Sequence, residues 1–442
     1  MTVSVLKPLL RGSAVSCSAL MLAFPVFAQQ TDSLEIERLK RQMDAVTRQL
    51  EELTLGRDVV AQADTSQWGL GPAASKVYRV QRGVSIGGYG EILYENFATT
   101  REDGTPSGKT DQLDALRAVV YVGYKFSDRF LFNSEIEIEH SATGQAGSVA
   151  LEFAYVDYRF SDGAGIRSGL VLLPMGFVNE MHEPTTFLGT ERPETERQII
   201  PSTWREVGVG VFGEASALSY RAFLVNGLDG AGGGTSKAKG FSASGLRGGR
   251  QKGSKAVAED LAVVARVDYG LMRGLALGTS AYYGGSGQSN VVGSPNPETI
   301  GAKTFIWEGH TEYKAHGFDL RGLVAMADVQ DVALLNQFKS LEGDESIGER
   351  LLGWYVQGGY DVLRSVGTQH QLIPFARYER LNTQKRVPSG YAANPANDRQ
   401  ILVLGMSWRP ISNFVTKAEY QFHSNQANSG VNQFNLALGY VF

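Results

Sequence analysis

Side-chain character alternates along most of this chain, and this alternation constrains the fold more than any other feature. Over the last ten residues, large apolar side chains occupy every second position: Phe434, Leu436, Leu438, Tyr440 and Phe442. The positions between them hold Asn435, Ala437, Gly439 and Val441. A period of two places these sets on opposite faces of a β-strand. The pattern recurs from Gly83 onward, so the sequence predicts an all-β domain over 83–442.

The predicted strands favour a membrane-spanning barrel over a soluble β-sandwich, although a sandwich also alternates. They run for about 10–14 residues, which is enough to cross a bilayer at a tilt and more than most soluble strands have. Tyr, Trp and Phe gather at their ends, as in the aromatic girdles of such barrels. Short connections alternate with long ones, as periplasmic turns alternate with external loops. We therefore expect an antiparallel transmembrane β-barrel.

The number of strands follows from the connections. Seven short and eight long connections join sixteen strands, and single-chain bacterial barrels have an even number. One missed or split hairpin would give fourteen or eighteen. One stretch departs from the pattern, because Glu152 falls on a face predicted to be apolar. The long connections are predicted at 98–112, 141–146, 174–204, 227–258, 285–301, 329–348, 383–397 and 425–430.

Composition excludes other classes of protein. Charged residues are 20% of the chain and hydrophobic residues 43%, and no apolar run reaches the roughly 18 residues of a membrane-spanning helix. A single cysteine excludes a disulfide scaffold, and a formal net charge of −4 argues against binding to nucleic acid.

The N-terminal 82 residues divide into three predicted segments. Residues 1–28 have a basic start, an apolar stretch and a small-residue cleavage site, which predicts a signal peptide and export to a Gram-negative envelope. Residues 29–55 carry apolar side chains at heptad spacing, which favours a short periplasmic coiled coil over an amphipathic helix packed on its own domain. Residues 56–82 lose this periodicity and are predicted to be a linker.

A sixteen-stranded barrel encloses a lumen too wide for side chains to fill. The inward positions carry charges of both signs, which fits a water-filled channel. We expect these residues on its wall: Arg117, Lys125, Glu135, Glu137, Glu139, Arg221, Arg266, Glu308, Arg321, Arg377, Lys417 and Glu419.

Two long connections are candidates for controlling passage. By analogy with large porins, 174–204 is expected to fold into the barrel and narrow it, because its apolar residues suit anchoring better than they suit a solvated lid. Its candidate residues are Glu180, His182, Glu183, Glu191, Arg192, Glu194, Glu196 and Arg197. The glycine-rich connection 227–258 carries six cations and is either a flexible external loop that meets lipopolysaccharide phosphates or an anion-gathering funnel. Those cations are Lys237, Lys239, Arg247, Arg250, Lys252 and Lys255.

Several stretches resemble the phosphate-selective porin O/P family. Pro174 and Gly176 precede an Asn-Glu-x-His-Glu-Pro run over 179–184, and 88–91 and 135–140 are similar too. The resemblance covers the chain from about Gly83 to Phe442 and is strongest between 83 and 215. It implies a water-filled, trimeric outer-membrane channel. Phosphate selection would require arginines that converge on the narrowest part, whereas 174–204 is net acidic.

Two functions remain open. The first is a porin for passive diffusion of ions and small hydrophilic solutes, including anions such as phosphate. The second is a plugged or structural barrel that anchors the envelope through its coiled coil. The residue pattern indicates no catalytic site, cofactor or metal. Expected partners are outer-membrane lipid and lipopolysaccharide, two further copies in a homotrimer, and the barrel-assembly machinery through the C-terminal Phe442.

Overall fold

The computed structural model describes residues 38–43, 45–46, 66–144 and 147–442. The chain divides into two units, Met1–Val60 and Ala61–Phe442. In the first unit, 38–43 and 45–46 are helical, and the side chains of Leu39, Met43 and Val46 are exposed. The predicted signal peptide, most of the predicted coiled coil and the linker as far as residue 65 lie outside the described residues.

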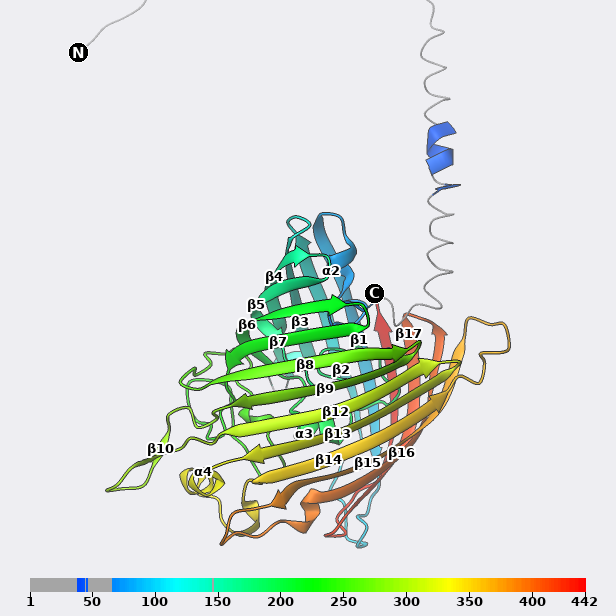
Figure 1. Cartoon of the computed structure of the whole chain (residues 1–442). Coiled ribbons are helices and arrows are strands. Elements are labelled where there is room, and N and C mark those ends of the chain that lie inside the picture. The colour runs from blue at the N-terminus through cyan, green and yellow to red at the C-terminus, as the bar shows by residue number, and fades with distance from the viewer. Residues whose placement is uncertain (1–37, 44, 47–65, 145–146) are drawn as a thin grey trace, which may run out of the picture. The chain divides into compact units, whose positions relative to one another are not determined.

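The second unit is a closed antiparallel barrel of sixteen strands (Figure 1), so the predicted fold class and strand number are confirmed. β1 (Gly83–Phe97) closes the ring against β18 (Gln433–Val441). The other barrel strands are β2 (Gln112–Lys125), β3 (Phe130–Gly144), β4 (Gly147–Ser161), β5 (Ala164–Leu172), β6 (Arg205–Ala215), β7 (Leu218–Asn226), β8 (Leu261–Met272), β9 (Leu275–Gly284), β12 (Thr304–Ala315), β13 (Phe318–Val329), β14 (Arg350–Tyr360), β15 (Gln371–Arg386), β16 (Asp398–Ile411) and β17 (Phe414–Asn425).

Short elements lie before the first strand and in the connections. They are α2 (Lys76–Arg79), α3 (Glu194–Gln198), η1 (Arg247–Gly249), the hairpin of β10 (Val291–Val292) with β11 (Glu298–Thr299), α4 (Val332–Lys339), η2 (Gly343–Glu345) and η3 (Pro395–Asn397). No helix among the described residues is both long and apolar enough to span a membrane.

The alternation of the sequence becomes an inside and an outside of the barrel. On β18, Leu436 and Tyr440 are 43% and 41% exposed, whereas Asn435 is fully buried. Ring closure pairs the backbone groups of the edge strands, so an apolar outer face can contact lipid without unpaired donors or acceptors.

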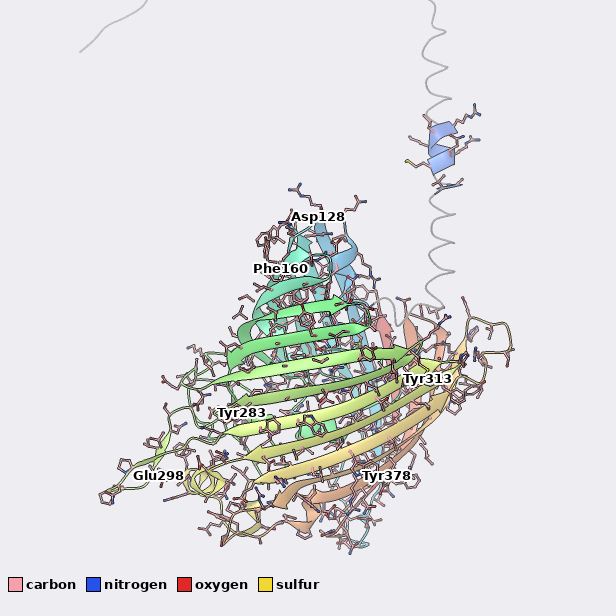
Figure 2. All side chains as sticks on the ribbon, in the orientation of Figure 1. Asp128, Phe160, Tyr283, Glu298, Tyr313 and Tyr378 are labelled. Carbon is pink, nitrogen blue, oxygen red and sulfur yellow. The ribbon has the colours of Figure 1, made fainter. Side chains whose placement is uncertain are left out.

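The connections differ at the two ends of the barrel. Figure 2 shows Asp128, in the turn between β2 and β3, at one end, which we call the short-turn end. Glu298, on the β10–β11 hairpin, lies at the opposite, long-loop end. The predicted long connection at 141–146 is shorter in the structure, because β3 ends at Gly144 and β4 begins at Gly147. The register between the two strands shifts between the pairs Glu139–Ser148 and Gly144–Gly147.

A β-bulge explains the irregular alternation around Glu152. The register of β4 against β3 shifts at this point, where Glu135 lies opposite Phe153 and Ile136 opposite Leu151. The extra residue turns Glu152 inward beside Phe153. There it is buried and accepts a hydrogen bond from Arg205 at 2.6 Å.

Candidate functional site

The connection 174–204, hereafter the inward loop, is closed at its base by one asparagine. The Nδ2 group of Asn179 donates to the carbonyl oxygens of Leu173 (2.7 Å) and Trp204 (2.9 Å), and its Oδ1 accepts from the backbone N–H of Trp204 at 2.6 Å. The two ends of the loop are therefore held together. The loop was expected to be anchored by apolar residues, and these five are all buried: Phe177, Phe187, Ile199, Ile200 and Trp204.

Cations of the barrel wall bind backbone carbonyl oxygens of the inward loop. These cations lie on β13, β15 and β17, so the loop reaches strands distant in sequence from its own. The contacts are Arg321 with Thr186 (2.7 Å), Lys417 with Gly189 (2.7 Å) and Arg377 with Glu191 (3.3 Å). Contacts with inward-facing side chains of these strands place the loop inside the lumen.

Carboxylates of the same wall receive backbone N–H groups of the loop. Glu419 accepts from the N–H and the hydroxyl of Thr190 at 2.8 and 2.7 Å, and Glu379 accepts from the N–H of Thr195. Both carboxylates are buried. The wall thus presents donors and acceptors that match the polar backbone of the loop, which limits the cost of burying it.

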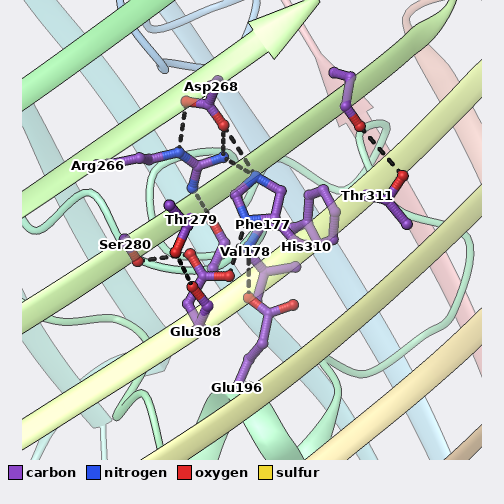
Figure 3. Close-up of polar contacts among 12 residues, drawn as sticks. Phe177, Val178, Glu196, Arg266, Asp268, Thr279, Ser280, Glu308, His310 and Thr311 are labelled. Carbon is purple, nitrogen blue, oxygen red and sulfur yellow. Dashed lines mark hydrogen bonds and ion pairs between the residues drawn. The ribbon is translucent and has the colours of Figure 1, made fainter. Parts of the chain in front are cut away.

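The start of the inward loop meets a charged cluster on β8 and β12 (Figure 3). Arg266 donates to the carbonyl oxygen of Gly176 and pairs with Asp268 at 2.8 Å. His310 lies 2.9 Å from Asp268 through Nε2 and 2.8 Å from Glu308 through Nδ1. The predicted wall residues Arg266 and Glu308 therefore belong to one hydrogen-bonded network.

One loop glutamate folds back into the loop. Glu196, on α3, accepts from the backbone N–H groups of Phe177 and Val178 at 2.8 and 2.9 Å and from the hydroxyl of Tyr355 at 2.6 Å. Burial raises the pKa of Glu196, and these hydrogen bonds lower it again in part. This glutamate is a structural brace and does not face a passage.

On the β2–β3 wall, the loop is joined through a histidine. Nδ1 of His182 lies 2.9 Å from the carbonyl oxygen of Asn179, and Nε2 lies 3.0 Å from Glu135. Burial lowers the pKa of His182 to about 4. Glu137, two residues along β3, pairs with Arg117 at 3.3 Å.

The remaining predicted wall residues are not all brought together. Arg221 lies near Glu180 of the loop, at 3.6 Å. Lys125 lies at the short-turn end, 3.8 Å from Asp128, and Glu139 binds Ser148 at 2.9 Å, away from the inward loop. These two form no part of the loop–wall contacts.

The glycine-rich connection 227–258 also contacts the inward loop, through residues that the sequence placed in an external loop. Arg250 donates to the carbonyl oxygens of Ser202 (2.8 Å) and Thr203 (2.6 Å), and Arg247 donates to the same carbonyl of Ser202. Arg192 reaches the hydroxyl of Thr203 at 3.2 Å. Burial, with Arg250 and other arginines nearby, lowers the pKa of Arg247 to about 8. Three guanidinium groups therefore gather on two successive residues.

A signal for this packing was present in the sequence. Leu228, Phe241 and Leu246 interrupt the glycine-rich stretch, and all three are fully buried. Lys237 and Lys239 are exposed, as a loop in solvent would have them. Glycine content alone pointed to flexibility, whereas the apolar residues decide the packing.

Comparison of the sequence with known proteins identifies a family for the chain. No family model matches the chain. An uncharacterized protein of Aquifex aeolicus (strain VF5) is 37% identical over 383 residues, which cover 85% of this chain and 83% of that protein. The chain belongs to the family of that protein.

For this family, solved structures identify the fold. The OmpF complex with daunomycin from Salmonella typhi has a TM-score of 0.52 at 12% identity, covering 82% of this chain and 98% of that one. The outer-membrane channel DcaP of Acinetobacter baumannii has 0.50 at 13%, covering 81% and 97%. The anion-selective porin from Comamonas acidovorans has 0.50 at 10%, covering 81% and 99%. The family member described here has a porin-like barrel.

Residues 66–80, hereafter the strap, lie inside this porin-like barrel instead of forming a linker. Trp68, Leu70, Val77 and Tyr78 are all at most 7% exposed and belong to the buried core. Because β1 begins at the short-turn end, the strap enters the lumen from that end. Aromatic residues at 68 and 78 were the available signal, but their partners lie more than 75 residues away, on other strands.

Proposed function

We propose that the protein is an outer-membrane porin through which ions and small hydrophilic solutes diffuse passively. The observation that carries the proposal is a loop held across a charged lumen by polar contacts on both sides. A barrel with a solid core would bury apolar side chains there, whereas charged walls suit water. The exposed apolar outer face and the porin-like fold support the membrane location.

The proposal also covers the orientation of the barrel in the outer membrane. With the short turns in the periplasm, β1 begins at the periplasmic end of the barrel. The proposal includes a cleaved signal peptide at 1–28 and a periplasmic coiled coil at 29–55. A three-stranded coil would join three barrels in a homotrimer. Lipid, lipopolysaccharide and, through Phe442, the assembly machinery are the proposed partners.

We assign the channel a preference for anions, with phosphate as the solute to test. Arg192, Arg247 and Arg250 converge where the glycine-rich connection meets the inward loop, and Arg197 adds a further cation of α3. Among the described residues, Nη2 of Arg192 is buried without a hydrogen-bond partner. This nitrogen is buried, so Arg192 would act on a passing anion through its charge and not through a direct hydrogen bond. This cluster offsets the acidic character of the inward loop and fits the resemblance to phosphate-selective porins.

Bilayer recordings of the purified protein test both parts of the proposal. We expect conductance in a salt gradient, a reversal potential of anion-selective sign, and reduced chloride current when phosphate is added. Arg247→Gln with Arg250→Gln should lower the anion-to-cation permeability ratio by roughly tenfold, the lower end of the effect of a charged cleft. Lys237→Gln with Lys239→Gln removes the same charge from exposed positions and should change little. An equal change of the permeability ratio in the two double variants would contradict the role of the arginine cluster. An absence of conductance would contradict the channel.

A plugged structural barrel is the second candidate. The strap favours it, because fifteen residues of chain occupy part of the lumen in addition to the inward loop. Under this alternative the wild-type protein would not conduct.

A further inference from the structure

The strap covers an aromatic part of the inner wall. Trp68 packs edge-on against Phe212 with ring centroids 4.9 Å apart. Val77 fills the space above Gly123, where a Cβ atom would lie 2.6 Å from Val77 Cγ2. Only glycine leaves room for this close approach. The strap therefore has a fitted seat on the wall of β2 and β6.

A buried polar cluster fixes the end of the strap. The hydroxyl of Tyr78 donates to Asp157 at 2.7 Å and accepts from Arg167 at 2.7 Å. Arg167 also donates through Nε to Asp157 at 2.9 Å. Buried polar groups are costly unless each finds a partner, so this cluster holds Tyr78 in one position.

The opposite side of the strap receives the inward loop. The carboxylate of Glu183 accepts from the backbone N–H groups of Ala73 and Ala74, both at 3.0 Å. A Cβ atom on Gly71 would lie 2.5 Å from Glu183 Oε1, so the carboxylate is in close contact with the strap backbone. In the part of the chain that the structure describes, no ion pair of Glu183 with a cation is present. The joint thus consists of one buried carboxylate and two backbone amides.

We propose that the strap is a second narrowing element of the lumen, which holds the inward loop through Glu183 and limits the width of the passage. It is fixed to the wall by Trp68 and Tyr78 and to the loop by Ala73 and Ala74. Its effect on conductance rests on the proposed channel function, whereas its attachment to the loop does not. Glu183 is in this sense a positioning residue, because it acts on the passage through the strap and the loop.

The test combines thiol labelling with conductance in the same protein. The single cysteine of the sequence, Cys17, lies in the predicted signal peptide and is lost on cleavage. Val77→Cys then places one thiol on the side of the strap that faces the wall, at a position 1% exposed. A water-soluble maleimide should label this thiol slowly. Glu183→Ala should accelerate labelling roughly tenfold, because the side-chain acceptor of two buried backbone amides is lost. Glu183→Gln, which keeps one acceptor oxygen, should have a smaller effect.

Two controls accompany the labelling. Glu298→Gln removes a carboxylate from the exposed β10–β11 hairpin and should leave the labelling rate of the Val77→Cys protein unchanged. Lys237→Cys in place of Val77→Cys reports an exposed thiol, which should react fast in every background. Far-UV circular dichroism establishes that each barrel is folded.

Conductance completes the test and separates the two proposals. We expect Glu183→Ala to raise single-channel conductance about twofold, since a widened constriction passes more solvated ions. A silent wild type with a conducting Glu183→Ala variant would support the strap and replace the open channel with a plugged barrel. A conducting wild type with unchanged labelling or unchanged conductance in the variant would overturn the strap alone. Silence in all variants would overturn the channel and the effect of the strap on conductance, and unchanged labelling in the Glu183→Ala variant would overturn the attachment of the strap to the loop as well.

Discussion

Two sides of the same lumen hold its contents differently. The inner wall of β1–β7 presents buried rings, and it is covered by the strap through ring packing and one buried polar cluster. The inner wall of β13–β18 presents cations and carboxylates that bind the backbone of the inward loop, and side-chain amides that bind its side chains. The rings concerned on the first side are Tyr89, Tyr121, Phe153, Tyr155, Phe212 and Phe223.

This difference predicts where contacts between protein groups can be exchanged for contacts with water. Exposing buried aromatic rings to water is unfavourable, so we expect the strap to stay on its wall unless its contacts are removed. Carbonyl and carboxylate groups can exchange a protein partner for water at small net cost. We therefore expect solutes to pass along the polar surfaces between the inward loop and the wall and not beneath the strap, and each experiment below challenges that distinction.

The largest expected effect comes from breaking the polar cluster on the strap side. Arg167→Met leaves Asp157 buried without its cation and should reduce the free energy of unfolding by roughly 3–5 kcal/mol, as measured by denaturant titration. Adding Asp157→Leu should restore much of this loss, because no uncompensated charge remains. A single variant as stable as the wild type would contradict the view that this cluster anchors the strap.

On the opposite side, removing a cation should change selectivity more than stability. Lys417→Met removes the donor to Gly189 and one positive charge from the β17 wall. We expect the reversal potential to shift toward cations, with a stability loss of about 1–2 kcal/mol. Trp68→Ala on the strap side is the matched comparison and should alter conductance without changing the sign of selectivity. If Trp68→Ala changed the sign of selectivity and Lys417→Met did not, the strap side would be the one that controls selectivity.

A pH dependence of stability should arise where the strap meets the loop. Burial raises the pKa of Glu183 to about 7 from its ordinary 4.5, while its two amide partners lower it in part. The folded state then holds a proton that the unfolded chain releases near pH 4.5, so this contribution to stability is full below that pH and is lost as the pH rises toward 7. The neighbouring groups that affect this carboxyl are His182 and Glu135. Glu183→Gln should therefore reduce the fall in melting temperature between about pH 5 and pH 8, whereas Glu298→Gln should leave it intact.

The smallest effect concerns screening. Charges act over about 10 Å at 0.1 M salt but only about 3 Å at 1 M. The anion preference assigned to the arginine cluster should weaken steadily over this range in bilayer recordings. Single-channel conductance, corrected for the bulk conductivity, should change less than the anion preference does. The width of the passage is set on the strap side by packing, which does not depend on salt. A selectivity that is independent of salt would point to direct coordination in place of a long-range field.

The sequence by itself determined the barrel, because a period of two is a local property that each strand carries alone. The strands of 83–442, their number and the inward placement of residues such as Glu135, Glu308 and Glu419 follow from it. Only the tertiary structure decided what fills the barrel. Trp68 meets Phe212, Glu183 meets Ala73, and Arg250 meets Thr203 across long sequence separations. The inward turn of Glu152 depends on a bulge in the register with a neighbouring strand. Such contacts leave no local periodicity in the sequence, since their free energy depends on which surfaces the closed ring brings face to face.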